Sequence, residues 1–450
     1  MREEARLSML DKTSAATRPT TDVDKVRRAL RTLDAGGSSA DQWHQQSIDF
    51  IQPLPLIDGA LRHRHDWVLW KGVDGRVRLG LGKADKTIHQ RFSTAAEQYR
   101  QSDRTPPFVF FGGRFDEERS AAPSPWSAWG TVEAYAPLIV LEWRTLDSNL
   151  VDVTVHRDSL DSCISLMHTL VEHDRSLPDE TTEIRWTPAE SEQAWCERVR
   201  QLQQSFQPNG LEKVVMARQV DSDEAIPIAR VIHAVHRLLS EGSNETVFVF
   251  GRETGIFMGS SPETLVNLQA GILRTHALAG TSTDRQDANQ LQHDEKIRRE
   301  HEAVIRHLES KLNAIATEIA VDETRLRHSR ALLHLETRVG AKIDGKHLLD
   351  LVAHLHPTPA LGGAPVEAAN AWLRANESLD RGWFGGPIGW FSSQGDGQCA
   401  VAIRCALLLD AGAHAYAGAG IVRGSDPNEE WRETRAKLAS ILGAFKACDA

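Results

Sequence analysis

A lysine at the start of an apolar strand is the first residue that could do chemistry. In EKVVMARQV (212–220), strand alternation places Lys213, Val215 and Ala217 on one face. Both faces are mostly apolar, so one of them must carry Lys213 inward or at its rim. A lysine that is withdrawn from water can act as a general base. The alternative is an edge-strand lysine whose amine reaches solvent.

An arginine lies within a second predicted strand, QCAVAIRCALLL (398–409). In that pattern Arg404 shares a face with Ala402 and Ala406, so its guanidinium has open space beside it. Such a site suits two parallel hydrogen bonds to the carboxylate of a ligand. A buried structural ion pair is the alternative.

Acidic residues on two predicted helices could bind a hard cation. In the last helix (427–445), Glu430 and Glu433 lie three residues apart, and Lys437 follows four residues later. Paired carboxylates suit Mg²⁺, although a solvated face with a Glu433–Lys437 pair has the same spacing. A long charged helix carries Glu300, which joins such a site only if the fold brings the two helices together.

Two glycine-rich segments, WFGGPIGW (383–390) and YAGAGIVRGSDP (416–427), are predicted to be turns. Gly418 and Gly420 could bring backbone N–H groups close to an anion just before the last helix. Ordinary turn glycines are the alternative. Neither segment is a GxGxxG fingerprint and no HExxH or CxxC occurs, so dinucleotide and zinc binding are not indicated.

The elements that must position these residues predict an α+β fold. Strand patterns dominate from residue 51 to about 155, and hairpins mix with helices afterwards, without βαβ alternation. This order favours large, mainly antiparallel sheets with flanking helices. We expect a leader or surface helix over 1–45, a β-rich half over 46–189 and a catalytic half over 190–446, the last two forming one integrated unit.

Composition excludes several classes of protein. The 450 residues include 52 basic and 62 acidic side chains, a net charge of −10. This balance argues against a general nucleic-acid binder but allows an anionic substrate in a local basic pocket. No apolar run long enough for a membrane span occurs, and the polar start does not predict a signal peptide. We therefore expect a cytoplasmic protein that does not associate with membranes, and a monomer.

Nine segments of the second half, in order, resemble the chorismate-utilising enzymes, the family of isochorismate, salicylate, anthranilate and aminodeoxychorismate synthases. The segments are KVVMAR (213–218), GSSPETL (259–265), ALAGT (277–281), EKIRREH (295–301), LLHLET (332–337), LHPTPALGG (355–363), RGWFGGPIGW (381–390), AIRCAL (402–407) and AGAGIVRGSDPNEEWRETRAKL (417–438). The resemblance implies the fold of anthranilate synthase component I and a chorismate substrate.

The resemblance also implies a role for each candidate residue. Lys213 would activate water to attack C2 of chorismate, and Glu263 would protonate the departing C4 hydroxyl. Three acids would hold Mg²⁺ with a substrate carboxylate: Glu300, Glu430 and Glu433. The remaining substrate contacts would come from Thr281, His334, Arg404, Gly418, Gly420 and Lys437.

The choice within the family depends on the nucleophile. Family members that use ammonia lack a lysine at position 213 and pair with a glutaminase subunit, so Lys213 implies water and no such partner. Phe384 stands where salicylate synthases have tyrosine, which favours an isochorismate synthase. A salicylate synthase, which also eliminates pyruvate, and a non-catalytic chorismate-binding relative are the alternatives. Ile297 departs from the family, which usually has an acid there near the metal, and the pathway (menaquinone, siderophore or salicylate) stays open.

Overall fold

The computed structural model describes residues 43–446, apart from 50–51, 64, 103–104, 120–122, 172–182, 207–209, 242–243, 283–292 and 330–331. Most of the expected leader, 1–45, lies outside the described residues. Within them, the strands form two antiparallel sheets, here called sheet A and sheet B. No helix in the described part of the chain is long and apolar enough to cross a membrane.

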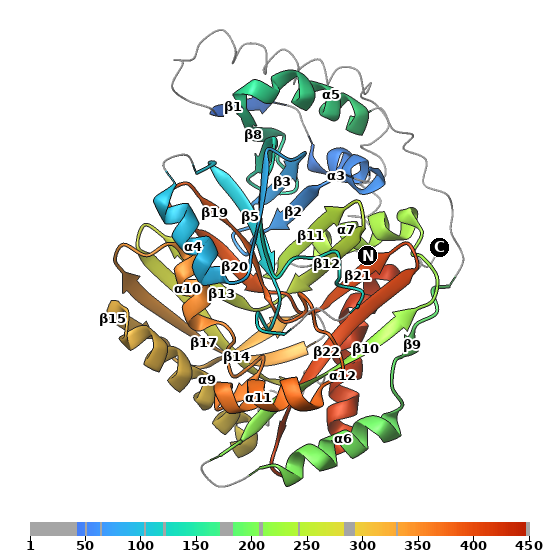
Figure 1. Ribbon diagram of the computed structural model, residues 1–450, viewed down its shortest axis with the longest axis vertical. Helices are drawn as coiled ribbons and strands as arrows, with labels where there is room; N and C mark the ends of the chain where they lie inside the picture. The colour runs from blue at the N-terminus through green and yellow to red at the C-terminus, as the bar shows by residue number, and fades with distance from the viewer. Residues whose placement is uncertain are drawn as a thin grey trace, which may run out of the picture.

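Sheet A combines strands from distant parts of the sequence (Figure 1). In spatial order they are β1 (Trp43–Asp49), β8 (Leu150–His156), β7 (Ile139–Trp143), β3 (Val77–Leu81), β2 (Trp67–Lys71), β11 (Thr246–Arg252), β12 (Gly255–Ser261), β21 (Cys405–Leu409), β22 (Gly412–Val422), β10 (Lys213–Ser222) and β18 (Gly363–Ala364), with β9 (Thr187–Pro188) also paired to β10. Strands from before and after residue 189 therefore share one sheet.

Sheet B is built in the same way. Its order is β15 (Ala316–Val321), β17 (Leu332–Ile343), β14 (Ile272–Ser282), β13 (Thr264–Gln269), β20 (Gly397–Val401), β19 (Pro387–Ser392), β5 (Phe108–Gly113), β6 (Val132–Ala136) and β4 (Asp85–His89), with β16 (Arg325–Ser329) also paired to β17. The sequence-based prediction of an α+β fold with mainly antiparallel sheets is confirmed.

Helices cover the outer faces of both sheets. Sheet A packs under α3 (Pro53–Arg62), α5 (Leu160–Val171) and α7 (Ile228–Glu241). Sheet B packs under α4 (Phe92–Gln101), α9 (Glu295–Asn313) and α10 (Leu348–Leu355). The strands β10 and β22 carry α6 (Glu192–Gln204), α11 (Val366–Asn376) and α12 (Pro427–Leu442), as Figure 1 shows near its lower edge.

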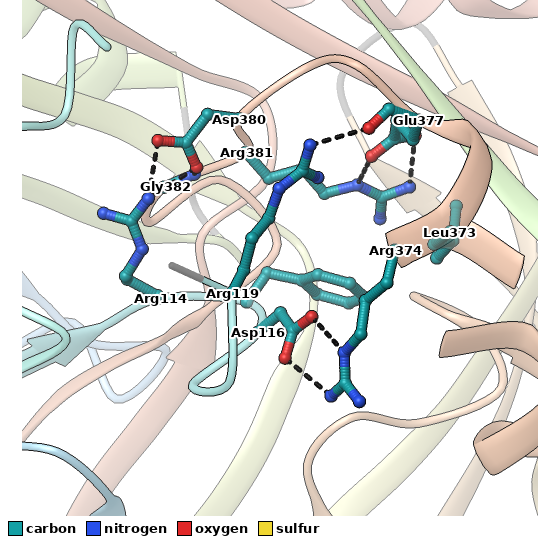
Figure 2. Close-up of a pocket in the computed structure, with 10 residues that line it drawn as sticks. Arg114, Asp116, Arg119, Leu373, Arg374, Glu377, Asp380, Arg381 and Gly382 are labelled. Atoms are coloured by element: carbon teal, nitrogen blue, oxygen red, sulfur yellow. Dashed lines mark hydrogen bonds and ion pairs between the residues drawn. The ribbon is translucent and has the colours of Figure 1, made fainter. Parts of the chain in front are cut away.

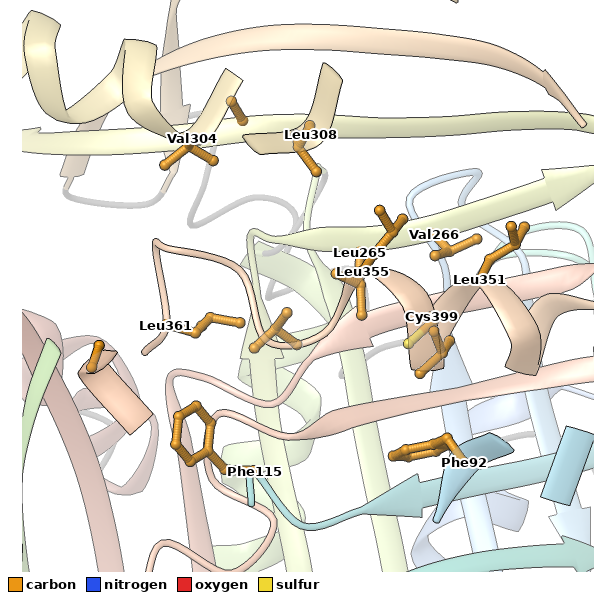
Figure 3. Packing of buried hydrophobic residues seen from close by; sticks show 14 of the residues in the cluster. Phe92, Phe115, Leu265, Val266, Val304, Leu308, Leu351, Leu355, Leu361 and Cys399 are labelled. Carbon is orange, nitrogen blue, oxygen red and sulfur yellow. The ribbon is translucent and has the colours of Figure 1, made fainter. Parts of the chain in front are cut away.

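The space between the sheets is an aromatic core. Trp70 and Phe248 come from sheet A, Phe110 comes from sheet B, and all three are fully buried in the same cluster. On the outer side of sheet B, Figure 3 shows Leu308 of α9 and Leu355 of α10 near Leu265, all three within a second apolar cluster. Each such side chain contributes about 1.5–3 kcal/mol by burial, so the two sheets and their helices form one rigid support.

Three local predictions differ from the structure. The segment 398–409 is not one strand, because β20 of sheet B ends at Val401 and β21 of sheet A begins at Cys405. Between them Arg404 has a φ of 51°, a left-handed conformation that few residues other than glycine adopt. Gly418 and Gly420 lie inside β22 rather than in a turn. The region 51–155, predicted to be mostly strand, also contains α3 and α4.

Candidate active site

The site forms where the chain crosses between the two sheets. It passes from sheet A to sheet B through Glu263, between β12 and β13, and returns to sheet A through Arg404. The crossings run side by side, since the N–H of Val401 donates to the Glu263 carbonyl at 3.0 Å and the N–H of Ser260 donates to the Arg404 carbonyl at 3.1 Å. Two residues that are distant in sequence are thereby fixed next to each other.

Lys213 begins β10 and is buried, with 8% of its surface exposed. Val214 packs on the opposite, helical side in the second apolar cluster, as strand alternation requires. Gly420 of the neighbouring strand makes room for the lysine, because a Cβ there would lie 2.6 Å from Lys213 Cε. The lysine Nζ lies 3.8 Å from Oε2 of Glu300, which projects from α9.

The outer edge of β10 is closed by a buried ion pair. Arg381 contacts the two oxygens of Glu377 at 2.6 and 2.8 Å and donates to the Val215 carbonyl at 2.6 Å. Glu377 accepts from the N–H of Ala217 at 3.2 Å, and the N–H of Val215 donates to the Gly362 carbonyl at 2.9 Å. Between the short strands β18 and β9, side chains and one loop thus replace a neighbouring strand along this edge of β10.

Figure 2 shows the pocket beside this ion pair. Its wall also holds Asp116 with Arg374, at 2.7 and 2.8 Å, and Asp380 with Arg114, at 2.5 Å. The acids and arginines drawn there are engaged with one another. We therefore assign this pocket a supporting role for β10 rather than a role in binding substrate.

The hydrogen bonding of β10 sets the direction of two glycine amides. Gly420 pairs with Val215 and Gly418 pairs with Ala217. The N–H groups of Val215 and Ala217 point away from β22, so these are the non-hydrogen-bonded pairs of the ladder and both glycines direct their own polar groups away from β10. In agreement, the Gly418 carbonyl accepts from Lys437 Nζ at 2.9 Å. The expected backbone donors therefore exist, presented by a strand.

The last helix, α12, supplies further charged groups. Asp426 caps it by accepting from the N–H groups of Asn428 and Glu429, which confirms the predicted N-terminus. Glu433 lies 2.5 Å from Lys437, and Glu430 is buried one turn earlier. The Glu433–Lys437 pair expected on a solvated face is present, but it lies at the site.

Burial dominates the electrostatics of the site. It raises the pKa of Glu263 to about 7, against the opposing attraction of Lys213, Lys437 and Arg404. Burial alone would also raise the pKa of Glu433, but Lys437, with Arg404 and Lys213, outweighs it and lowers that pKa. Five of the predicted residues therefore act on one another in a single site, and one of them, Glu263, keeps a proton near neutral pH.

Glu245 is a site residue that sequence reasoning missed. It precedes β11, is 4% exposed and accepts from the Ser260 hydroxyl at 2.5 Å. Burial lowers the pKa of Arg404 to about 10, and Glu245 is the largest charge that opposes this shift. The charge of Glu245 thus partly compensates the buried guanidinium of Arg404. An acid directly before the apolar strand TVFVFG was the available signal.

The three predicted metal-binding acids do not form a closed group. Among the described residues, no three acidic, histidine or cysteine side chains converge on one point. Glu300 and Glu433 instead lie beside Lys213 and Lys437. Mg²⁺ usually takes only one or two protein carboxylates and completes its shell with water and substrate oxygens. The donor set therefore fits an ion that is shared with a bound substrate.

The remaining predicted residues lie on sheet B. His334 is buried on β17, and strand alternation places it on the face opposite Leu333 and Leu335. Thr281 belongs to β14, but its side chain lies outside the described residues. Ile297 of α9 packs against Leu333 and Leu335, so the position that is usually acidic makes an apolar contact in this chain.

Comparison with known proteins identifies relatives of this chain. A family model described as chorismate binding enzyme matches residues 74–446. The isochorismate synthase MenF of Bacillus subtilis (strain 168) is 28% identical, over 89% of this chain and 93% of that enzyme. The isochorismate synthase EntC of Escherichia coli (strain K12) is 36% identical, over 52% of this chain and 62% of that enzyme.

Solved structures share the fold. The menaquinone-specific isochorismate synthase MenF of Escherichia coli superposes with a TM-score of 0.79 at 22% identity, covering 95% of this chain and 100% of that one. Anthranilate synthase component I of Streptococcus pneumoniae TIGR4 superposes with a TM-score of 0.67 at 18% identity, covering 90% of this chain and 93% of that one. The predicted fold class is confirmed by both.

Proposed function

The chain belongs to the family of chorismate binding enzymes, and on that premise we propose that it is a Mg²⁺-dependent isochorismate synthase. In this reaction water adds to C2 of chorismate, the ring double bonds shift and the C4 hydroxyl leaves, so the product is an isomer of the substrate. One feature carries the proposal: a buried lysine, Lys213, and a buried carboxyl whose pKa is raised to about 7, Glu263, share a site with Arg404.

Glu263 protonates the leaving hydroxyl. Because burial raises its pKa to about 7, much of the population carries the proton near neutral pH, and an acid with a pKa near the working pH is the most effective. Lys213 accepts the proton that water loses as its oxygen bonds to C2. Lys213 takes up one proton and Glu263 gives one out, so the net reaction is an isomerisation.

The two carboxylates of chorismate are bound at opposite ends of the site. Arg404, in its left-handed conformation between the sheets, and the outward amides of Gly418 and Gly420 bind one of them. Lys437 adds positive charge from α12, beside Gly418. Support comes from the electrostatic interaction between Arg404 and Glu263, which indicates that the two side chains face the same site.

Glu300, Glu430 and Glu433 would hold Mg²⁺ together with the other substrate carboxylate. The ion supplies positive charge that neutralises this carboxylate. Support comes from α9 and α12, which bring Glu300 and Glu433 to the same lysine, Lys213. Water as the nucleophile requires no ammonia, so the enzyme acts without a glutaminase subunit.

Product analysis tests the proposal. Purified protein is incubated with chorismate and Mg²⁺, and the products are separated by chromatography. We expect isochorismate in wild type and no turnover in Lys213→Ala. Lys71→Ala is a matched control, because Lys71 is equally buried, at 8% exposure, but its amine donates to the Leu239 carbonyl of α7, a helix on the outer face of sheet A.

Each other outcome has a definite meaning. Salicylate with pyruvate would identify a salicylate synthase instead. Full activity in a folded Lys213→Ala protein would remove the assigned base, and absence of any product from wild type would refute the enzymatic function.

A further inference from the structure

The two strands that follow the crossing at Glu263, β13 and β14, lose their backbone pairing close to that residue. The ladder between β13 and β14 extends only as far as Asn267, which pairs with Arg274. Nearer to Glu263, Thr264 pairs with Ala400 of β20 on one side. On the β14 side, its N–H donates to Nε2 of His276 at 3.2 Å. A side chain takes the place of the missing backbone partner.

Other contacts hold both peptides that flank Glu263. The hydroxyl of Thr275 donates to the Thr264 carbonyl at 3.4 Å. On the preceding side of Glu263, the backbone carbonyl of Pro262 also accepts a hydrogen bond from the His276 ring. The turn that carries the acid is thus held from β14 on both sides of Glu263, and His276 makes one contact on each side.

The imidazole must be neutral to accept an N–H, and its surroundings keep it so. Burial lowers the pKa of His276 to about 3, and Arg327 and Arg338 act in the same direction against Glu336. Glu336 Oε1 lies 3.9 Å from Nδ1, the ring nitrogen that bears the proton when Nε2 accepts. Arg325 and Arg327 in turn bind Glu336, at 2.5 and 2.8 Å, which fixes its position.

We propose that His276 is a positioning residue for Glu263. By accepting the N–H of Thr264 it fixes the peptide that follows Glu263, and hence the direction in which the carboxyl group projects. This inference rests on the proposed function, in which Glu263 delivers a proton to the substrate. Proton delivery requires hydrogen-bond reach, so a displacement of about 1 Å lowers the rate about 100-fold.

Two substitutions separate positioning from simple stability. His276→Leu keeps an apolar side chain of similar bulk but removes the acceptor, whereas His276→Gln retains an acceptor at similar reach. We expect kcat to fall about 100-fold in His276→Leu and less than about tenfold in His276→Gln, with KM for chorismate within about twofold of wild type. The KM is preserved because Arg404 and the glycine amides are untouched.

His347→Leu is the matched control. His347 is also a buried histidine that accepts a backbone N–H, from Leu349 at 3.2 Å, but it caps α10. We expect this variant to lose stability without losing kcat. If His276→Leu does not fold, His276→Asn, whose amide is too short to reach Thr264, replaces it.

The outcomes distinguish this inference from the proposed function. A wild-type protein that makes no isochorismate overturns the function, and the role of His276 with it. If wild type is active, any of three results overturns the positioning role alone. The first is an unchanged kcat in His276→Leu, and the second is a KM for chorismate that rises in parallel in that variant. The third is an equal loss of kcat in His347→Leu.

Discussion

Replacing Glu263 by glutamine should abolish turnover and yet stabilise the protein at neutral and higher pH. Burial raises the pKa of this carboxyl from 4.5 to about 7, so the folded state keeps a proton that the unfolded state has already released. The free energy of unfolding of wild type therefore falls as the pH rises between about 4.5 and 7. Above that range the full cost of ionising the buried carboxyl remains. The pKa difference corresponds to about 3 kcal/mol at most, and glutamine carries no such penalty.

Thermal unfolding at several pH values measures this effect. Unfolding entropy is about 2.1 cal/mol/K per residue, so about 3 kcal/mol moves the Tm of a chain of this length by about 3 °C. We expect wild type and Glu263→Gln to differ little at about pH 5 and the variant to unfold about 3 °C higher at about pH 8. A difference that does not change with pH, or a less stable variant at about pH 8, would refute the reasoning.

Asp380→Asn is a control of opposite sign. Burial alone would raise the pKa of Asp380, but hydrogen bonds from Ser124 and Arg114 outweigh it and lower that pKa. The ionised carboxylate therefore adds stability above its unfolded pKa, which is lost as the pH falls. We expect the asparagine variant to be less stable at neutral pH and to approach wild type in acid.

Three further predictions concern the site. Gly420→Ala should lower kcat about tenfold or more in steady-state assays, because its methyl would lie 2.6 Å from Lys213 Cε. The Tm should stay nearly unchanged, because the end of the lysine side chain can move. An unchanged kcat would contradict the close packing of Gly420 against Lys213. Arg404→Lys should raise KM for chorismate about 10- to 100-fold with a smaller effect on kcat, since lysine cannot form the paired hydrogen bonds; equal loss in both would argue against carboxylate binding. EDTA should remove activity and added Mg²⁺ should restore it; activity that persists in EDTA would exclude the metal.

Regular periodicity made part of this fold predictable. The helix α12 and its Asp426 cap follow from local sequence, and so does the hairpin of β11 and β12. Each signal is local, because the cap and the apolar spacing depend on neighbouring residues. The resemblance to a family supplied most of the candidate site residues, since the motifs name positions without requiring the pairing of strands to be known.

What could not be predicted depends on pairing between distant strands. Arg404 was expected inside a strand because alanine-rich alternation continues through it, whereas the chain changes sheets there. Neither Glu245 nor His276 belongs to a spaced motif with the residues that they support. Their importance arises only when the β12–β13 crossing is placed against β14 and β21, and this is decided by long-range burial rather than by local sequence.

The strands between Pro387 and Val422 occupy the middle of both sheets: β19 and β20 separate β13 from β5, and β21 and β22 separate β12 from β10. During synthesis on the ribosome these central strands emerge after the strands that they separate. Until they arrive, four inner strands present open edges, which are prone to join other chains. A nascent chain halted before this segment would therefore be an aggregation hazard.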